Sequence, residues 1–129
     1  NKDFQNLKEL NEISNIHIIP FTNHMDIFYS AADLVVSRSG ALALSEMALL
    51  GKAMILIPFP SSAGNHQFIN AQTFQKINGA LLVNQSSLKS GSLEKAIFPL
   101  IHNAKKITSM EKNSKKLGQP DATRKIINI

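Results

Sequence analysis

Short apolar runs alternate with helical segments along this chain, and that alternation limits the folds it can adopt. The apolar runs cover residues 16–19, 34–36, 53–57 and 80–83. Between them, helical patterning is found at residues 23–32, 41–50 and 66–77. Short strands that alternate with helices of this length are typical of a parallel sheet with right-handed crossovers. The sequence therefore predicts an α/β fold, an open parallel sheet with helices on both faces.

Residues that favour helix ends support these boundaries. Asn23 and Asn65 are expected to cap helices at their first turns. Gly51 and the pair Asn78–Gly79 directly follow two other helical segments, where glycine and asparagine are common. A short amphipathic helix is expected at residues 4–10, ahead of the first strand.

The region from about Ser92 to Ile129 is expected to be helical. Apolar residues three or four apart form one stripe along it: Leu93, Ala96, Ile97, Leu100 and Ile101. Pro120 is expected to open a last helix as its first residue.

The same C-terminal region carries the positive charge of the chain. Of the 14 Lys and Arg residues, nine lie from Lys89 onward, against three of the nine acidic residues. Such a region can be a solvated helix face, a membrane-surface patch or a polyanion site. No aromatic residue lies among the lysines after Phe98, and base stacking needs such residues, so no nucleic-acid partner is expected.

The cysteine and histidine content excludes several kinds of site. The chain has no cysteine, which rules out zinc fingers, iron–sulfur clusters and cysteine nucleophiles. His17, His24 and His102 share no spacing typical of a metal site, so neither a metal nor a cofactor is expected. The chain begins at Asn1 without an initiator methionine or an apolar signal stretch, which suggests a piece of a longer protein.

Ligands of open parallel sheets bind beyond the carboxyl ends of the strands, so the turn at residues 37–43 is a first candidate site. Ser39 is expected to cap the following helix, and Gly40 allows a ligand to approach the backbone closely. The free N–H groups of Gly40 to Ala43, together with the helix dipole, predict a site for a phosphate or diphosphate. The alternative is that Ser39–Gly40 makes only a tight strand-to-helix turn.

Glu46 follows Ser39 by seven residues, which places it on the same helix face, roughly 10 Å along the axis. The helix at residues 41–50 is apolar apart from Ser45 and Glu46, so the carboxylate is expected to be buried and to need partners. Ribose hydroxyls would donate hydrogen bonds to it at about the right distance from a diphosphate. An ion pair with Arg38, or a position in water at the rim, is the alternative.

The turn at residues 58–67 is the second candidate site. Two prolines fix its entry, and His66 and Gln67 stand at the next helix start, with Asn70 one turn on. The amides of Gln67 and Asn70 both donate and accept hydrogen bonds, as vicinal hydroxyls of a sugar require. His66 is interpreted as a base, a hydrogen-bond donor or only a helix-start residue.

Taken in order, these motifs resemble the C-terminal, donor-binding domain of the MurG family of peptidoglycan N-acetylglucosaminyltransferases. The likeness covers roughly Pro20 to Ile129 and rests on residues 32–42, Ser45–Glu46, Gly51, Pro58–Phe59–Pro60, His66–Gln67, Asn70–Ala71 and 120–123. The family has the GT-B fold, two Rossmann-like domains that face each other across a cleft. The resemblance implies that residues 1–129 are part of the C-terminal domain and that the N-terminal acceptor domain is absent.

The resemblance also implies roles at the first turn. Glu46 would accept hydrogen bonds from the ribose hydroxyls. The backbone N–H groups of Ala41, Leu42 and Ala43 would hold the diphosphate and a GlcNAc hydroxyl, although Ala43 stands where some members have a hydroxyl residue.

The resemblance implies further roles at the second turn. His66 and Gln67 would contact the sugar, with Asn70 close behind them, while the two residues before His66 differ from the family's charged pair.

The backbone at Thr22, flanked by Phe21 and Met25, would face the uracil. Arg38, beside the anion turn, completes the set of candidate binding residues.

The activity that the resemblance implies is inverting transfer of GlcNAc from UDP-GlcNAc to lipid I, giving lipid II. The undecaprenyl-linked acceptor would bind through the absent domain, which would also supply the base, so this piece alone is expected to be inactive. The implied location is the bacterial cytoplasm, peripheral on the cytoplasmic face of the inner membrane, with the basic helices near its anionic surface. The alternatives are a small UDP-GlcNAc transferase subunit with a membrane partner, a UDP-sugar epimerase and a non-catalytic nucleotide-binding module.

Overall fold

The centre of the molecule is a parallel sheet of three strands, as the sequence predicted. The computed structural model describes residues 7–118 and residue 126. Within them, β1 (Val35–Ser37), β2 (Met54–Leu56) and β3 (Ala80–Leu82) lie in the order β1-β2-β3, and Ile55 is paired with both Val36 and Leu81. β1 is an edge strand of this sheet, and its Val36 side chain is exposed.

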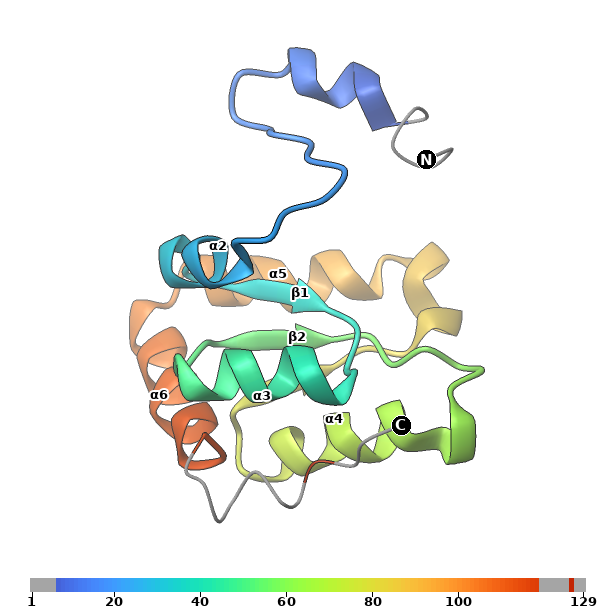
Figure 1. Ribbon diagram of the computed structural model, residues 1–129, viewed down its shortest axis with the longest axis vertical. Coiled ribbons are helices and arrows are strands. Elements are labelled where there is room, and N and C mark those ends of the chain that lie inside the picture. The colour runs from blue at the N-terminus through green and yellow to red at the C-terminus, as the bar shows by residue number, and fades with distance from the viewer. Residues whose placement is uncertain (1–6, 119–125, 127–129) are drawn as a thin grey trace.

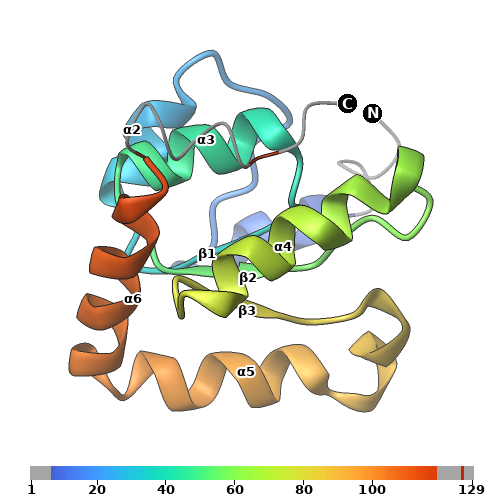
Figure 2. The same cartoon turned by 90° about the horizontal axis from the view of Figure 1, so that it is seen from below.

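Helices cover both faces of the sheet. Figure 2 shows α3 and α4 on one face and α5 on the other, with α6 beside the sheet and α2 next to α3. The α-helices are α2 (Met25–Ala31), α3 (Ala41–Leu49), α4 (His66–Lys76), α5 (Ser92–Ile101) and α6 (Ala104–Lys116). Three 3-10 helices complete the described elements: η1 (Lys8–Glu12), η2 (Ala63–Asn65) and η3 (Gln85–Ser90).

The alternating side chains of β2 build two cores. Met54 and Leu56 pack into the core shared with α3 and α4, while Ala53 and Ile55 pack into the core shared with α5 and α6. All four side chains are fully buried, as expected for a central parallel strand covered on both faces. The loops that follow β1, β2 and β3 are therefore carried by a rigid support.

α2 is tied to the sheet by a buried lysine. The Nζ atom of Lys52 donates hydrogen bonds to the backbone oxygens of Ser30, at 3.4 Å, and Ala32, at 2.9 Å. These oxygens lie at the C-terminal end of α2, where a positive charge is favourable. The position of α2 relative to β2 is thereby set, and α2 forms one wall of the main pocket.

The strand predicted at residues 16–19 is not formed. The segment is extended, but no strand pairs with it among the described residues, and the backbone N–H of Ile18 donates to Asn11 Oδ1. Figure 1 shows this N-terminal segment reaching away from the sheet. An apolar run becomes a strand only where another strand supplies hydrogen-bond partners. Of the helix predicted at residues 4–10, the described part is the first portion of η1, a 3-10 helix.

One predicted cap is wrong, and another is right in its position only. The N-cap of α2 is His24, whose N–H donates to Thr22 Oγ1 at 3.0 Å, and Asn23 lies before it. Asn65 is the N-cap of α4, as predicted, but it has the left-handed conformation with φ 56° and makes no side-chain capping bond. The predicted helix ends at Gly51 and Asn78–Gly79 are confirmed.

The apolar stripe of the C-terminal region is confirmed except at one residue. Leu93, Ala96, Ile97 and Leu100 pack into the core shared by α5 and α6. Ile101, by contrast, is 55% exposed at the end of α5. The helix predicted to open at Pro120 lies outside the described residues.

Candidate functional site

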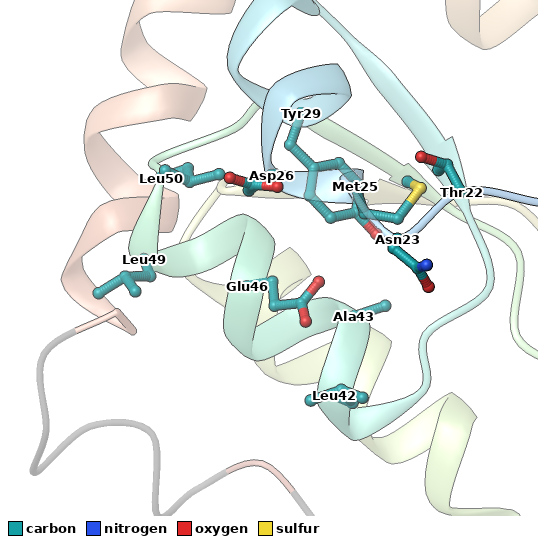
Figure 3. Close-up of a pocket in the computed structure, with 10 residues that line it drawn as sticks. All are labelled: Thr22, Asn23, Met25, Asp26, Tyr29, Leu42, Ala43, Glu46, Leu49 and Leu50. Carbon is teal, nitrogen blue, oxygen red and sulfur yellow. The ribbon is translucent and has the colours of Figure 1, made fainter.

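A cavity of about 530 Å³ lies between α2 and α3 and extends along α3 from Leu42 to Leu50. That volume is typical of a small-molecule site. Figure 3 shows the residues that line it: Thr22, Asn23, Met25, Asp26, Tyr29, Leu42, Ala43, Glu46, Leu49 and Leu50. We call this cavity the α2–α3 pocket.

The helical period of α3 separates a buried face from the pocket wall. Leu44, Met47 and Ala48 are fully buried toward the sheet. Leu42 and Leu49, on the other side of the helix, are exposed and line the pocket, and Leu42 is 75% exposed. An apolar helix side without a protein partner is thus available to an apolar part of a ligand.

Glu46 lies on this open side, which corrects the prediction that its carboxylate is buried. The residue is exposed, and its side chain makes neither a hydrogen bond nor an ion pair with the described residues. In Figure 3 its carboxylate points from α3 into the space that α2 borders. Arg38 is not its partner, because the Arg38 side chain contacts the loop after β2. The carboxylate is therefore free to accept hydrogen bonds from a ligand.

Tyr29, on α2, is the main pocket residue that the sequence interpretation missed. It is 8% exposed, and burial together with the negative charge of Glu46 raises the pKa of its hydroxyl. The hydroxyl therefore stays protonated and can donate a hydrogen bond at neutral pH. Its position four residues after Met25, on the same face of a helix, was the available signal.

The N-terminus of α3 presents unpaired backbone donors at the edge of the pocket. Gly40 is the N-cap, without a side-chain capping bond, and its carbonyl accepts from Leu44 N–H at 3.0 Å. The N–H groups of Ala41, Leu42 and Ala43 have no acceptor among the described residues. With the positive end of the helix dipole, they can bind an anion.

Ser39 is not the cap that the sequence predicted. Its side chain is fully buried, and its Oγ donates to the backbone oxygen of Gln67 at 2.6 Å. Asn70, also fully buried, donates from Nδ2 to the backbone oxygen of Ser39 at 3.3 Å. Both side chains hold the two turns together from behind and do not face open space.

Gln67 connects the two predicted turns. Its Oε1 accepts from Phe59 N–H at 2.9 Å, and its own N–H donates to Ser62 Oγ at 3.2 Å. Its Nε2 lies 3.8 Å from where a Cβ on Gly40 would stand. An amide donor is thereby held beside the turn before α3, where glycine leaves room next to the backbone.

The other candidate residues lie farther from the α2–α3 pocket. The His66 ring packs on Gly64, where an added Cβ would lie 2.8 Å from Nε2, and His66 Nδ1 is buried without a partner among the described residues. Arg38 Nη1 donates to the backbone oxygens of Ile57 and Pro58, and the guanidinium lies 5.6 Å from the centre of the Phe59 ring. Phe21 is exposed and does not line the pocket, whereas its neighbours Thr22 and Met25 do.

The chain matches a known family of protein domains. Residues 1–126 match the model of the glycosyltransferase family 28 C-terminal domain. The chain belongs to this family.

The family 28 domain is similar to curated relatives and to a solved structure. It is 41% identical, over 90% of the chain, to the UDP-N-acetylglucosamine--N-acetylmuramyl-(pentapeptide) pyrophosphoryl-undecaprenol N-acetylglucosamine transferase of Caldicellulosiruptor saccharolyticus. It is 37% identical, over 94% of the chain, to the transferase of the same name from Listeria monocytogenes. The crystal structure of Acinetobacter baumannii MurG superimposes with a TM-score of 0.81 at 29% identity and covers 95% of the chain.

The chain spans about a third of the length of these proteins: 31% and 33% of the two relatives, and 36% of the crystallised chain. The likeness in structure confirms the predicted Rossmann-like sheet with flanking helices. In the described part of the family 28 domain, no helix is both long and apolar enough to cross a membrane. Those same residues contain no group of three or more histidine or acidic side chains able to hold a metal ion.

Proposed function

We propose that this chain forms the UDP-GlcNAc-binding part of an inverting glycosyltransferase that transfers GlcNAc to lipid I, giving lipid II. The observation that carries the proposal is the order of groups along α3. N–H groups without an acceptor among the described residues stand at its first turn, and the carboxylate of Glu46 follows about one turn later along one pocket. A nucleoside diphosphate carries its anionic and hydroxyl groups in the same order.

The proposed binding mode assigns one part of the donor to each part of the pocket. The diphosphate accepts from the N–H groups of Ala41, Leu42 and Ala43, and the ribose hydroxyls donate to Glu46. The base lies against Thr22 and Met25. The sugar lies toward Gln67, whose Nε2 faces Gly40.

The proposed chemistry is a displacement at the anomeric carbon of GlcNAc. The acceptor hydroxyl forms the new glycosidic bond, and the bond between the anomeric carbon and the diphosphate oxygen breaks. The N-terminus of α3 stabilises the negative charge that develops on the departing UDP. The base that removes the acceptor proton comes from an N-terminal acceptor domain outside residues 1–129, so this piece alone is proposed to be inactive.

Calorimetry on the full-length protein tests the donor assignment. Glu46→Gln removes the negative charge but keeps the shape, and UDP-GlcNAc affinity is expected to fall about 10- to 100-fold, the range for hydrogen bonds to a charged group. Glu94→Gln, on α5, is the matched control and is expected to leave the affinity unchanged. Equal affinities of the Glu46→Gln and unaltered proteins would contradict the ribose assignment.

Binding and turnover assays on the same full-length protein distinguish the alternative functions. UDP-GlcNAc is expected to bind more tightly than UDP-GalNAc, and lipid II is expected to form only when lipid I is added. Interconversion of the two UDP-sugars would indicate an epimerase, and dependence on a separate membrane protein would indicate a transferase subunit. Nucleotide binding without turnover would indicate a binding module.

We further propose that the full-length protein acts at the cytoplasmic face of the inner membrane of a bacterium, with the basic C-terminal helices close to anionic lipid. The support is the excess of lysine in α6, which carries Lys105, Lys106, Lys112, Lys115 and Lys116. Cosedimentation with vesicles of anionic lipid is expected to weaken as salt is raised. Equal binding to neutral vesicles would contradict this role.

A further inference from the structure

A second cavity, of about 290 Å³, opens where the chain leaves β2 and β3. Three short segments line it: Pro58, Phe59 and Pro60 after β2, Asn65 and Phe68 at the start of α4, and Asn84, Gln85 and Ser86 after β3. We call it the β2–β3 loop cavity. It shares no lining residue with the α2–α3 pocket, and its volume suits a single sugar ring better than a nucleotide.

The polar side chains of this cavity are available to a ligand. The side chains of Asn65, Asn84, Gln85 and Ser86 make no hydrogen bond with any described residue, and all four residues are exposed. Each amide can donate two hydrogen bonds and accept others. Convergent free donors and acceptors in a concave site are the usual means by which a small ligand is oriented.

Two aromatic rings supply the apolar part of the cavity. Phe59 is 44% exposed, and Phe68 is half-buried on the first turn of α4. No lysine, arginine or acidic residue lines the cavity. An uncharged lining with aromatic rings and amides fits a ligand with apolar C–H faces and polar edges, and it offers no counter-charge to a phosphate or carboxylate.

The loop cavity is joined to the anion-binding turn through Phe59. The Phe59 N–H donates to the Gln67 amide, whose Nε2 faces Gly40, and Arg38 lies over the Phe59 ring. The Gln67–Phe59 contact therefore links the loop cavity to the turn before α3, and Leu42 and Ala43 at the start of α3 line one end of the α2–α3 pocket. A ligand in the loop cavity would lie beyond the sugar end of a donor bound in the α2–α3 pocket.

We propose that the β2–β3 loop cavity is a separate subsite for one neutral sugar ring, held by the amides and packed against the two phenylalanines. That the ring is an N-acetylhexosamine rests on the proposed function. Occupation of this subsite does not require that the α2–α3 pocket bind UDP. The binding of sugar in one cavity and of nucleotide in the other can be measured independently.

Ligand-observed NMR on the full-length protein, with the methyl glycoside of GlcNAc as probe, tests this subsite. The glycoside is expected to bind when UDP is present at saturation. Gln85→Ala and Asn84→Ala are each expected to weaken that binding about three- to tenfold, the effect of one lost hydrogen bond. Gln75→Ala, an exposed amide on α4 outside the cavity, is the matched control. UDP affinity is expected to stay unchanged in all three variants.

Two results would overturn the subsite: no glycoside binding at saturating UDP, or binding that Gln85→Ala and Asn84→Ala leave intact. Loss of UDP binding in Glu46→Gln tests the donor pocket alone, so failures of the two proposals are distinguishable. A second probe, the methyl glycoside of an N-acetylmuramyl amide, identifies the source of the ring. Tighter binding of the muramyl probe assigns the subsite to the acceptor, and tighter binding of the GlcNAc probe assigns it to the transferred sugar or product.

Discussion

The turns that follow β1 and β2 look alike in sequence, since both contain small polar residues and lead directly into a helix, yet they handle their polar groups in opposite ways. At the first turn, the N–H groups that begin α3 have no partner among the described residues. At the second turn, the groups around Gln67 are used internally, by Ser39, Phe59 and Ser62. The first turn is open to a ligand, and the second turn holds the first turn in place.

The largest expected effect on UDP affinity comes from a negative charge placed at the first turn. Leu42→Asp brings a carboxylate to the place proposed for the diphosphate, and UDP affinity is expected to fall about 100-fold because like charges in contact cost several kcal/mol. The fold is expected to remain intact, because Leu42 is exposed and an acidic residue is favourable at a helix N-terminus. The measurement is calorimetry on the full-length protein.

Leu42→Asn is the matched control, because it has nearly the same shape and no charge. Its UDP affinity is expected to stay close to that of the unaltered protein. If Leu42→Asp and Leu42→Asn bind UDP equally well, the diphosphate does not lie at the N-terminus of α3.

The hydrogen bond that joins the two turns is tested by stability and not by binding. Ser39→Ala removes the buried hydrogen bond from Ser39 Oγ to the carbonyl oxygen of Gln67, and the free energy of unfolding is expected to fall by about 1 kcal/mol. UDP affinity is expected to change far less than in Leu42→Asp. Denaturant unfolding, with Ser45→Ala on α3 as the control, measures the difference. If Ser39→Ala has normal stability but has lost UDP binding, Ser39 contacts the ligand and is not a supporting residue.

The smallest expected effect concerns Tyr29, where α2 faces the open turn. Because the pKa of its hydroxyl is raised in the folded protein, the folded state holds this proton more tightly than the unfolded state does. The resulting stability is fully present below about pH 10, the ordinary tyrosine pKa, and is lost as the pH rises through the higher folded pKa. The stability difference between the unaltered protein and Tyr29→Phe is therefore expected to shrink above pH 10. Unfolding curves at neutral pH and at pH 11 measure it, and a constant difference would contradict a buried phenol.

The sheet and its helices could be predicted because they depend on local patterns. The apolar runs that became β1, β2 and β3 are short and bounded by helix signals, and Gly51 and Asn78 adopt positive φ where their helices end. Residues 16–19 have the same apolar character but form no strand, because a strand also depends on a neighbour that the pattern does not identify. Fold class was therefore predictable where strand pairing was not.

The chemical groups of the candidate site could be predicted from the sequence, but the solvent exposure of its side chains could not. Glu46 and the N-terminus of α3 were correctly expected near each other, since helix geometry fixes their spacing. The prediction that Glu46 is buried was wrong. It rested on the apolar residues of α3 that flank Glu46, and composition does not reveal which leucines face a core and which face a pocket. The β2–β3 loop cavity gave no sequence signal at all, because its lining comes from three segments that only the fold brings together.

The edge position of β1 has a practical consequence for anyone who prepares residues 1–129 by themselves. Backbone donors and acceptors along the outer side of β1 have no strand beside them in the described residues, and such an edge is a template for adding a strand from another molecule. Self-association of the isolated piece is therefore expected to increase with concentration. Size-exclusion chromatography at several loading concentrations should precede any binding measurement on it. A dimer that pairs through β1 would be a folded, stable particle, and its binding behaviour could be mistaken for that of the monomeric domain.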